Sequence, residues 1–242
     1  MATNLYEKDL FINPAIPFLF NKNITEYDMK NAGFSLIKEF KLLSDSDIDK
    51  LDKLPKDKQK VKIGILRRDN KDFSKALSVS FKLAREEFFK ENDLNDNDII
   101  SIKKDAIFTC KNCSKQKIGS YIDFRDKNHY TSYIHLNNKI EVYYSLNQID
   151  IKGLSKKNIE LHKDEMVSLI SEFCRRMETQ SNEKVLSWFK QFIDKYKKRE
   201  VNEGYYRTFN ADSGFMLDNE NKVFDISYNY YNVLLKLVQI PL

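Results

Sequence analysis

The sequence predicts an α+β fold in which helices pack on an antiparallel sheet. Between residues 98 and 147, Tyr, Ile and Phe alternate with polar residues, as expected of strands with one covered face. Stretches with apolar residues at helical spacing precede and follow this region. With only 6 Gly and 4 Pro in 242 residues, and no linker rich in Ser and Gly, we expect one main core.

The first part of the chain is expected to hold one strand and several helices. Residues 1–22 are predicted to be an irregular lead-in. The elements expected next are a strand at 23–29 and helices at 32–43, 45–54 and 55–68. Ser44 is well placed to cap the second of these helices, with Asp47 at the fourth position of a capping box.

The clearest helix is predicted from Asp72, its expected N-cap, to about Asn92. One apolar face runs along it, formed by Phe73, Leu77, Phe81, Ala84, Phe88 and Phe89. The elements predicted after it are strands at 98–109, 116–125, 129–137 and 139–147, helices at 158–179 and 182–199, and a β-hairpin at 214–226. We therefore expect an α+β domain over residues 1–154, with an insertion at about 36–71, and a helical region over 155–242 that includes the hairpin.

Composition excludes several classes of protein. The opening MATNLYEKDLF is charged, which argues against a signal peptide and a membrane anchor. Three cysteines are an odd number, and we expect reduced thiols in a cytoplasm. Cys110 and Cys113 have the spacing of half a zinc site, but Cys174 and the histidines are isolated. We expect free thiols and no zinc.

The formal charge of +5 permits phosphate binding without requiring it. Basic residues cluster at 56–68 and 195–200, where solvated helix faces and phosphate contacts are equally good interpretations. The same two interpretations apply to the basic residues of the two C-terminal helices, Arg175, Arg176, Lys195, Lys197 and Lys198. The aromatic residues of the strand region favour core packing over base stacking; they are Tyr121, Phe124, Tyr130, Tyr133, Tyr143 and Tyr144.

Two aspartates are the best candidates for chemistry. The chain has no Walker A loop, GxSxG elbow, HExxH motif or Rossmann glycine pattern. Asp28 lies at the end of a predicted strand, and Asp105 lies within the apolar pattern IISIKKDAIFT. A carboxylate among apolar strand residues requires a partner or a cation. Two such carboxylates on neighbouring strands would form an oxygen-ligand site for divalent metal ions, although a solvated pair is the commoner outcome.

The order of several short segments resembles family B DNA polymerases. EYDMKNAGFSLI (26–37) is similar to their motif A, and SIKKDAIF (101–108) is similar to their motif C. The helix with FKLAREEFF (81–89) resembles the helix before motif C, and residues 128–154 resemble the segment with Lys-x-Tyr and a later Lys-Gly. The resemblance covers residues 24–154 and implies a polymerase palm, followed by a helical thumb-like region.

The resemblance implies a role for individual residues. Asp28 and Asp105 match the metal-binding aspartates, and Met29 matches the residue that lends its backbone carbonyl. Lys103 replaces the first motif C aspartate, and Gly33 replaces the sugar-sensing Tyr. Further matches, some by position only, are Lys60, Arg67 and Arg68 for nucleotide phosphates and Tyr130 and Lys152 for nucleic acid; Asn128 replaces the Lys of Lys-x-Tyr.

Two functions remain open at this point. The first is a nucleotidyltransferase that uses Mg²⁺ or Mn²⁺, nucleoside triphosphates, and DNA or RNA. The second is a non-catalytic nucleic-acid-binding or assembly subunit with a degenerate palm, which Lys103 and the short insertion favour. Either would suit a viral or phage protein in the host cytoplasm, with possible protein partners and no membrane.

Overall fold

The computed structural model describes residues 4–137, 140–153, 156–210 and 214–217. The chain divides into two compact units. Unit 1 comprises the residues up to Asn13 together with Asn23–His129, and unit 2 comprises Pro14–Lys22 and the residues from Tyr130 onward. Each unit has its own buried hydrophobic cluster. This differs from the expected single core with a boundary near residue 154.

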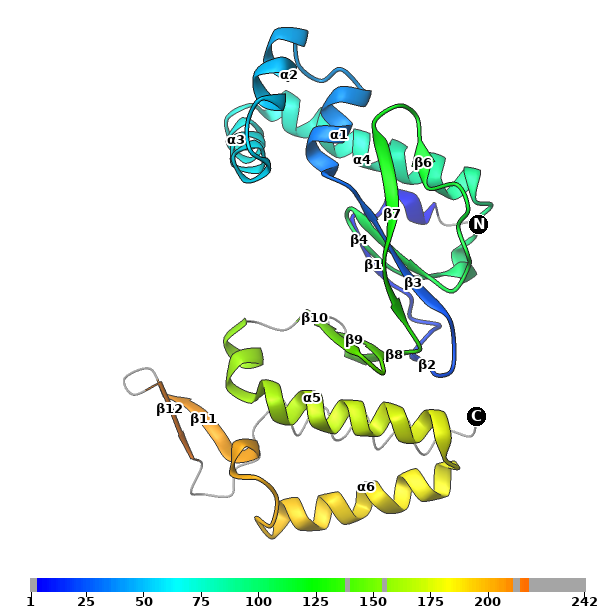
Figure 1. Cartoon of the computed structure of the whole chain (residues 1–242), viewed down its shortest axis with the longest axis vertical. Coiled ribbons are helices and arrows are strands. Elements are labelled where there is room, and N and C mark those ends of the chain that lie inside the picture. The colour runs from blue at the N-terminus through cyan, green and yellow to red at the C-terminus, as the bar shows by residue number, and fades with distance from the viewer. Residues whose placement is uncertain (1–3, 138–139, 154–155, 211–213, 218–242) are drawn as a thin grey trace. The chain divides into compact units, whose positions relative to one another are not determined.

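The described residues form an α+β fold with two main antiparallel sheets, a separate small hairpin and six α-helices, which confirms the predicted class (Figure 1). Unit 1 contains η1 (Leu5–Glu7), β1 (Leu10–Ile12), β3 (Ile24–Met29), α1 (Ala32–Glu39), α2 (Asp45–Asp52), α3 (Lys56–Asp69), α4 (Lys71–Glu91), η2 (Asp96–Asp98), β4 (Ile99–Lys103), β5 (Ala106–Thr109), β6 (Lys117–Ile118) and β7 (Ile122–Tyr130). Unit 2 contains β2 (Phe18–Leu19), β8 (Ser132–Asn137), β9 (Ile140–Ser145), β10 (Gln148–Lys152), α5 (Lys156–Thr179), α6 (Asn182–Lys197), η3 (Glu203–Tyr206), β11 (Arg207–Asn210) and β12 (Gly214–Leu217).

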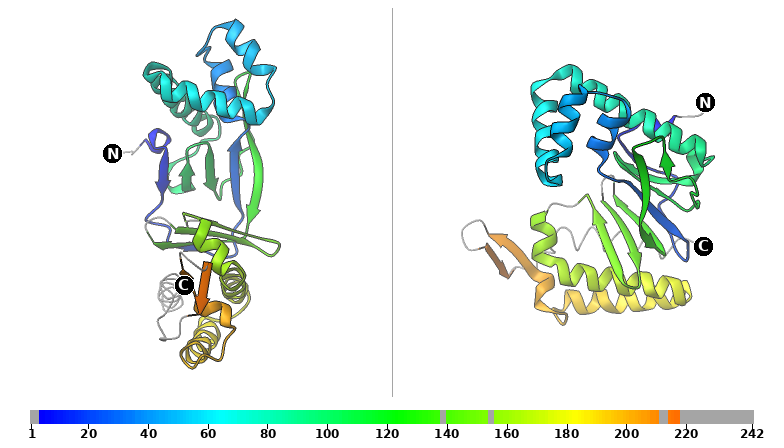
Figure 2. Two further views of the ribbon diagram at one scale, coloured as in Figure 1. Left: turned by 90° about the vertical axis from the view of Figure 1, so that its left-hand side faces the viewer. Right: turned by 45° about the horizontal axis from the view of Figure 1, so that its top comes forward.

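The sheet of unit 1 has the strand order β1-β4-β5-β3-β7-β6. The apolar stripe predicted along α4 packs on this sheet, because the Phe88 ring lies 4.4 Å from the ring of Phe124 and 5.6 Å from that of Tyr27. Helices α1 and α3 both contact α4, and Figure 2 shows this helical layer from two further directions.

Several predicted boundaries change for local reasons. The strand expected at 98–109 is a hairpin, since Lys104 adopts a left-handed conformation (φ 56°) and turns the chain between β4 and β5. Gly119 (φ 70°) likewise divides the strand expected at 116–125 into β6 and β7. Helix α4 is capped by Asn70, whose Oδ1 accepts a hydrogen bond from the Phe73 amide at 2.9 Å, and not by Asp72. The Ser44 cap of α2 is confirmed.

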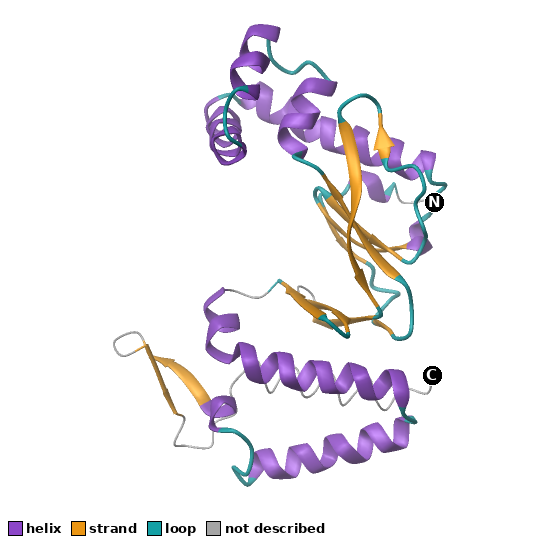
Figure 3. Cartoon of the chain, viewed as in Figure 1, coloured by secondary structure: helices purple, strands orange, loops and turns teal. Residues whose placement is uncertain are grey.

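Unit 2 joins the second sheet to the last two α-helices. Its sheet has the order β10-β9-β8-β2, and Figure 3 shows α5 and α6 lying side by side. Ile134 and Val142 of the sheet belong to the same cluster as Phe173 of α5 and Phe189 of α6. The strands after residue 130 therefore belong with the C-terminal helices, because their apolar face is covered there. A hairpin was expected at 214–226, but the described part of it, β12, pairs with β11, which precedes it in the chain. Residues 218–226 of the expected hairpin lie outside the described residues.

None of the described helices is long and apolar enough to cross a membrane.

A buried arginine connects three parts of unit 1. Arg85 of α4 has no exposed side-chain surface. Its guanidinium donates hydrogen bonds to the Tyr6 carbonyl (2.7 Å), the Lys104 carbonyl (2.6 Å) and Asp9 Oδ1 (2.9 Å). Burial lowers the pKa of Arg85, and the charge of Asp9 opposes this shift. The contacts attach both the N-terminal segment and the β4–β5 turn to α4.

We predict that Arg85→Met lowers the free energy of unfolding by about 3 kcal/mol, because it leaves two carbonyl groups without their charged donor. Urea unfolding monitored by circular dichroism would measure this. Arg68→Met is the matched control, since Arg68 is exposed and pairs with Asp69 at the surface. Similar stability of the two variants would contradict the anchoring role of Arg85.

Candidate functional site

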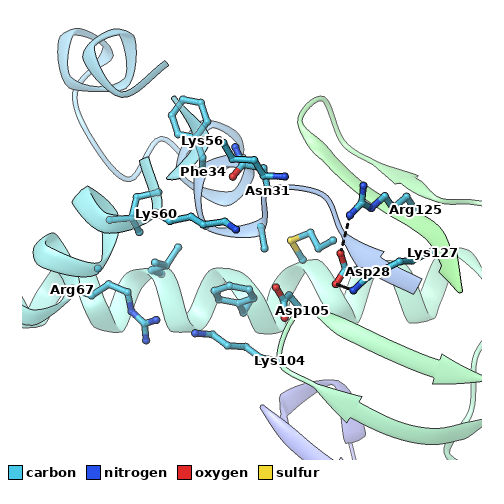
Figure 4. A pocket seen from close by; sticks show the side chains of 17 residues that line it. Asp28, Asn31, Phe34, Lys56, Lys60, Arg67, Lys104, Asp105, Arg125 and Lys127 are labelled. Carbon is cyan, nitrogen blue, oxygen red and sulfur yellow. Dashed lines mark hydrogen bonds and ion pairs between the residues drawn. The ribbon is translucent and has the colours of Figure 1, made fainter. Parts of the chain in front are cut away.

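Unit 1 contains a pocket of about 490 Å³ that is lined by residues of α1, α3, α4, β3, β7 and the β4–β5 turn. Two carboxylates, Asp28 and Asp105, face it (Figure 4). Six basic residues also line it, namely Lys56, Lys60, Arg67, Lys104, Arg125 and Lys127. A pocket with this excess of cations is suited to a ligand with several negative charges.

Strand pairing brings the two carboxylates to the same pocket. Asp28 is the penultimate residue of β3 and lies opposite Ala106 in the antiparallel pairing with β5. Asp105 immediately precedes Ala106 in the turn. The amide of Met29 donates a hydrogen bond to the Asp105 carbonyl at 2.9 Å, which fixes the end of β3 against this turn.

The two carboxylates experience different environments. Burial raises the pKa of Asp105, and the negative charge of Asp28 raises it further. Asp28 has two cationic partners: Arg125 Nη2 lies 3.5 Å from its Oδ2, and Lys127 Nζ lies 3.4 Å from its Oδ1. The ionised form of Asp105 is thus destabilised by its surroundings, and a bound cation would relieve its repulsion with Asp28.

Lys127 also contacts a second carboxylate, Glu26, which does not line the pocket. Its Nζ lies 3.2 Å from Glu26 Oε1, and the Glu26 side chain is 2% exposed. Asn128 Nδ2 donates to Glu26 Oε2 at 2.7 Å. Burial alone would lower the pKa of Lys127, but the charges and hydrogen bonds of Glu26 and Asp28 raise it. Lys127 therefore bridges Glu26 and Asp28 as an ammonium ion.

The basic residues of α3 face the pocket from another side. The α3 residues that line the pocket recur every three or four positions, which places them on one helical face. They include Lys56, Lys60, Gly64 and Arg67. Arg67 Nε is buried and has no hydrogen-bond partner within the described part of the chain. Burial lowers the pKa of Lys104, and the charge of Arg67 lowers it further. An anionic ligand would relieve this repulsion between cations.

The donor set fits Mg²⁺ only together with a ligand. Among the described residues, no group of three or more His, Cys, Asp or Glu side chains could hold a metal ion. Mg²⁺ commonly binds to one or two carboxylates and completes its octahedron with water and substrate phosphates. Asp28 and Asp105 in a cationic pocket match that pattern, with phosphate supplying the missing oxygens.

The structure brings together part of the predicted site. Asp28, Met29, Gly33, Lys60, Arg67 and Asp105 line the pocket. Arg68 does not, because it is exposed and pairs with Asp69 at 2.7 Å. The alternation of Arg125 and Lys127 on one face of β7 was a detectable signal that the sequence-based prediction missed. Lys104 was missed too, since its place in the pocket depends on the turn.

The remaining predicted residues lie in unit 2, which includes Tyr130, the last residue of β7. Tyr130 is 1% exposed and its hydroxyl donates to Asp150, so its ring is not available for stacking on a base. Lys152 Nζ lies 3.9 Å from the same carboxylate. Arg175 and Arg176 both pair with Glu172. Three predicted lysines are exposed at the end of α6, namely Lys195, Lys197 and Lys198.

The cysteines have different environments. Cys110 is exposed, whereas Cys113 and Cys174 are buried. Burial raises the pKa of the Cys113 thiol to about 11, and its Sγ lies 3.7 Å from the Lys111 carbonyl oxygen. The absence of zinc stays a prediction, to be tested by elemental analysis.

Comparison with known protein families finds a match over nearly the whole chain. The model of the family described as the bacteriophage PBS1 gene 130 protein matches residues 1–239. No curated protein matches the chain.

We predict that Asp105→Asn raises the melting temperature at neutral pH. The folded-state pKa of Asp105 is raised, so its ionised form costs stability, and wild-type stability falls as the pH rises through that pKa. The gain should disappear at pH values below the ordinary range of an aspartate. Thermal unfolding from acidic to neutral pH would test this.

Asp28→Asn is the matched control. It removes the carboxylate that holds Arg125 and Lys127, so it should give no such gain. If Asp105→Asn changes the melting temperature by the same amount at every pH, the ionised Asp105 carboxylate is not destabilised by its surroundings.

Proposed function

The chain belongs to the bacteriophage PBS1 gene 130 protein family, and we propose that this phage protein is a nucleotidyltransferase with a small polymerase-like palm. One observation carries the proposal: strand β3 and the β4–β5 turn present Asp28 and Asp105 to one cationic pocket. The resemblance of residues 24–154 to family B DNA polymerases, with its motifs in the same order, supports the same reading. The protein would act in the host cytoplasm.

Phosphoryl transfer is the chemistry that suits this arrangement. In nucleotidyl transfer, a hydroxyl oxygen forms a bond to the α-phosphorus of a nucleoside triphosphate. The bond from that phosphorus to pyrophosphate breaks, and the hydroxyl proton goes to solvent. Charge accumulates on phosphate oxygens during this reaction, so positioned cations supply most of the catalysis.

Each group of pocket residues has a distinct task in this proposal. Asp28 and Asp105 would hold Mg²⁺ or Mn²⁺, which activates the hydroxyl and neutralises phosphate charge when bound. Lys60 and Arg67 of α3 would bind the phosphates of the incoming nucleotide. Arg125 and Lys127 would meet anionic groups on the other side of the carboxylates. Gly33 would leave room beside the sugar.

The second candidate is a nucleic-acid-binding subunit that has lost its chemistry. Arg125 and Lys127 favour it, because they already neutralise Asp28 without a metal ion. In this case phosphates would bind to the pocket and to the exposed lysines at the end of α6, and no nucleotide would be transferred. Binding would weaken steeply with salt in both candidates, because each phosphate contact releases a condensed counterion.

We predict that Asp28→Asn and Asp105→Asn each reduce nucleotide incorporation by at least about a thousandfold, the size expected when a principal electrostatic contact in the transition state is lost. Primer extension with Mg²⁺ or Mn²⁺ would measure this. Asp126→Asn is the control, since that carboxylate pairs with His129 on β7 and does not line the pocket.

The same preparations should be tested for binding to single-stranded and primed DNA and RNA. Salt-dependent binding without incorporation by the wild type would select the non-catalytic candidate. Absence of binding even at low ionic strength would exclude both candidates.

We predict that the wild type discriminates poorly against ribonucleotides, and that Gly33→Tyr selectively lowers their use. The Gly33 backbone is outside the left-handed region, and an added Cβ would meet only Ile63 atoms at 3.6 Å. Space therefore permits a side chain, and a ring there would exclude a 2′-hydroxyl. Gly33→Ala is the control for loss of glycine alone; equal loss of both nucleotide classes in the Tyr variant would disprove this role.

A further inference from the structure

We propose that Lys127 keeps Asp28 closed to divalent cations until a polyphosphate ligand enters the pocket, an inference that rests on the proposed function. The Lys127 ammonium lies 3.4 Å from Asp28 Oδ1, and Arg125 holds the other oxygen at 3.5 Å. Both oxygens of this carboxylate thus have a cationic partner (Figure 4). A divalent ion has to compete with these groups for Asp28.

The two carboxylates that Lys127 bridges are not equivalent. Glu26 is 2% exposed, whereas the side chain of Asp28 is 18% exposed and faces the pocket. A buried carboxylate that loses its cation carries a large desolvation cost. Lys127 therefore keeps its ion pair with Glu26 and gives up its ion pair with Asp28 when a more strongly charged ligand enters the pocket. Glu26 acts as the fixed anchor of this bridge.

A polyphosphate ligand can open the bridge because it attracts the same cations. The Arg125 side chain is 48% exposed, and its guanidinium has the planar donor geometry that matches phosphate oxygens. Lys127 is 38% exposed, so its ammonium can reach a ligand in the pocket. Phosphate oxygens would weaken the hold of both groups on Asp28, and they would also supply ligands to the incoming metal ion.

This arrangement couples the binding of metal and phosphate. Asp28 and Asp105 alone give too few ligands for a tight Mg²⁺ site, and Asp28 is occupied by cations. A bound phosphate ligand would supply the missing oxygen ligands and would also draw the cations away from Asp28. By linkage, the metal ion must then raise the affinity for phosphate by the same factor.

The test is Mn²⁺ binding to the protein alone, measured from the electron paramagnetic resonance signal of free Mn²⁺. The informative variant is the double substitution Glu26→Gln with Lys127→Met. It removes the bridge without changing the net charge, and it leaves no buried Glu26 carboxylate that has lost its Lys127 partner. We expect its Mn²⁺ affinity to exceed that of the wild type by at least about fivefold, the factor for loss of one ion pair of ordinary strength.

Lys60→Met is the matched control for general electrostatics. It removes a cation from the same pocket, but Lys60 lies on α3 and does not pair with Asp28. We expect a smaller gain in Mn²⁺ affinity from this variant than from the double variant. An equal or larger gain would show that the field of the pocket, and not the bridge, limits metal binding.

The coupling itself is tested with inorganic tripolyphosphate, after subtraction of a protein-free titration of the same Mn²⁺ complex. Tripolyphosphate should increase Mn²⁺ binding by the wild type and have less effect on the double variant. Equal enhancement in both proteins would overturn the proposal.

The outcomes separate this proposal from the proposed function. If the wild type binds Mn²⁺ as tightly as the double variant, the bridge is irrelevant and the two-aspartate site survives. If neither protein binds Mn²⁺ at millimolar concentration with or without tripolyphosphate, the metal site fails and both proposals fall.

Discussion

One buried guanidinium determines the geometry on which the pocket depends. Arg85 holds the Lys104 carbonyl, and the Lys104 amide donates to the Asp9 carbonyl at 2.7 Å. These contacts stabilise a left-handed residue that is costly for a lysine and that ends β4 immediately before Asp105. Without this turn, the strand would continue and the side chains around Asp105 would alternate between the faces of the sheet. The contacts that Arg85 of α4 makes with this turn thus fix the position of the Asp105 carboxylate.

The pocket concentrates like charges, and this has a cost for the free protein. Asp105 is destabilised by burial and by Asp28, and Lys104 by burial and by Arg67. A fold selected only for stability would avoid both repulsions, whereas a site for a charged ligand uses them, since binding removes them. The fully buried and hydrogen-bonded Arg85 is a structural cation by contrast, because its donors are already engaged within the fold.

Local patterns predicted much of unit 1, and contacts between distant residues explain what they missed. The α+β class, the apolar stripe of α4 and the Ser44 cap follow from spacing and side-chain chemistry over a few residues. The prediction that Asp28 and Asp105 lie close together followed from the order of the motifs that resemble family B DNA polymerases, because that order carries information about strand pairing. The strand pattern at 98–109 did not reveal the β4–β5 turn, because Arg85, which stabilises it, is 19 residues away from Lys104. The second core was missed because alternation does not reveal which helices cover a strand.

The basic residues of the pocket belong to two classes, which composition cannot distinguish. Arg125 and Lys127 lie on β7 and form ion pairs with Asp28 and Glu26, so their positive charge is partly neutralised within the protein. Those of α3 gather on one helical face, and Arg67 keeps a buried donor without a partner in the described residues. A polyphosphate entering the pocket would therefore meet strong attraction at α3 first. Under the proposed coupling of metal and phosphate binding, only a ligand long enough to extend from α3 towards β7 would also draw the cations from Asp28, so a short phosphate chain would not open this carboxylate to a metal ion.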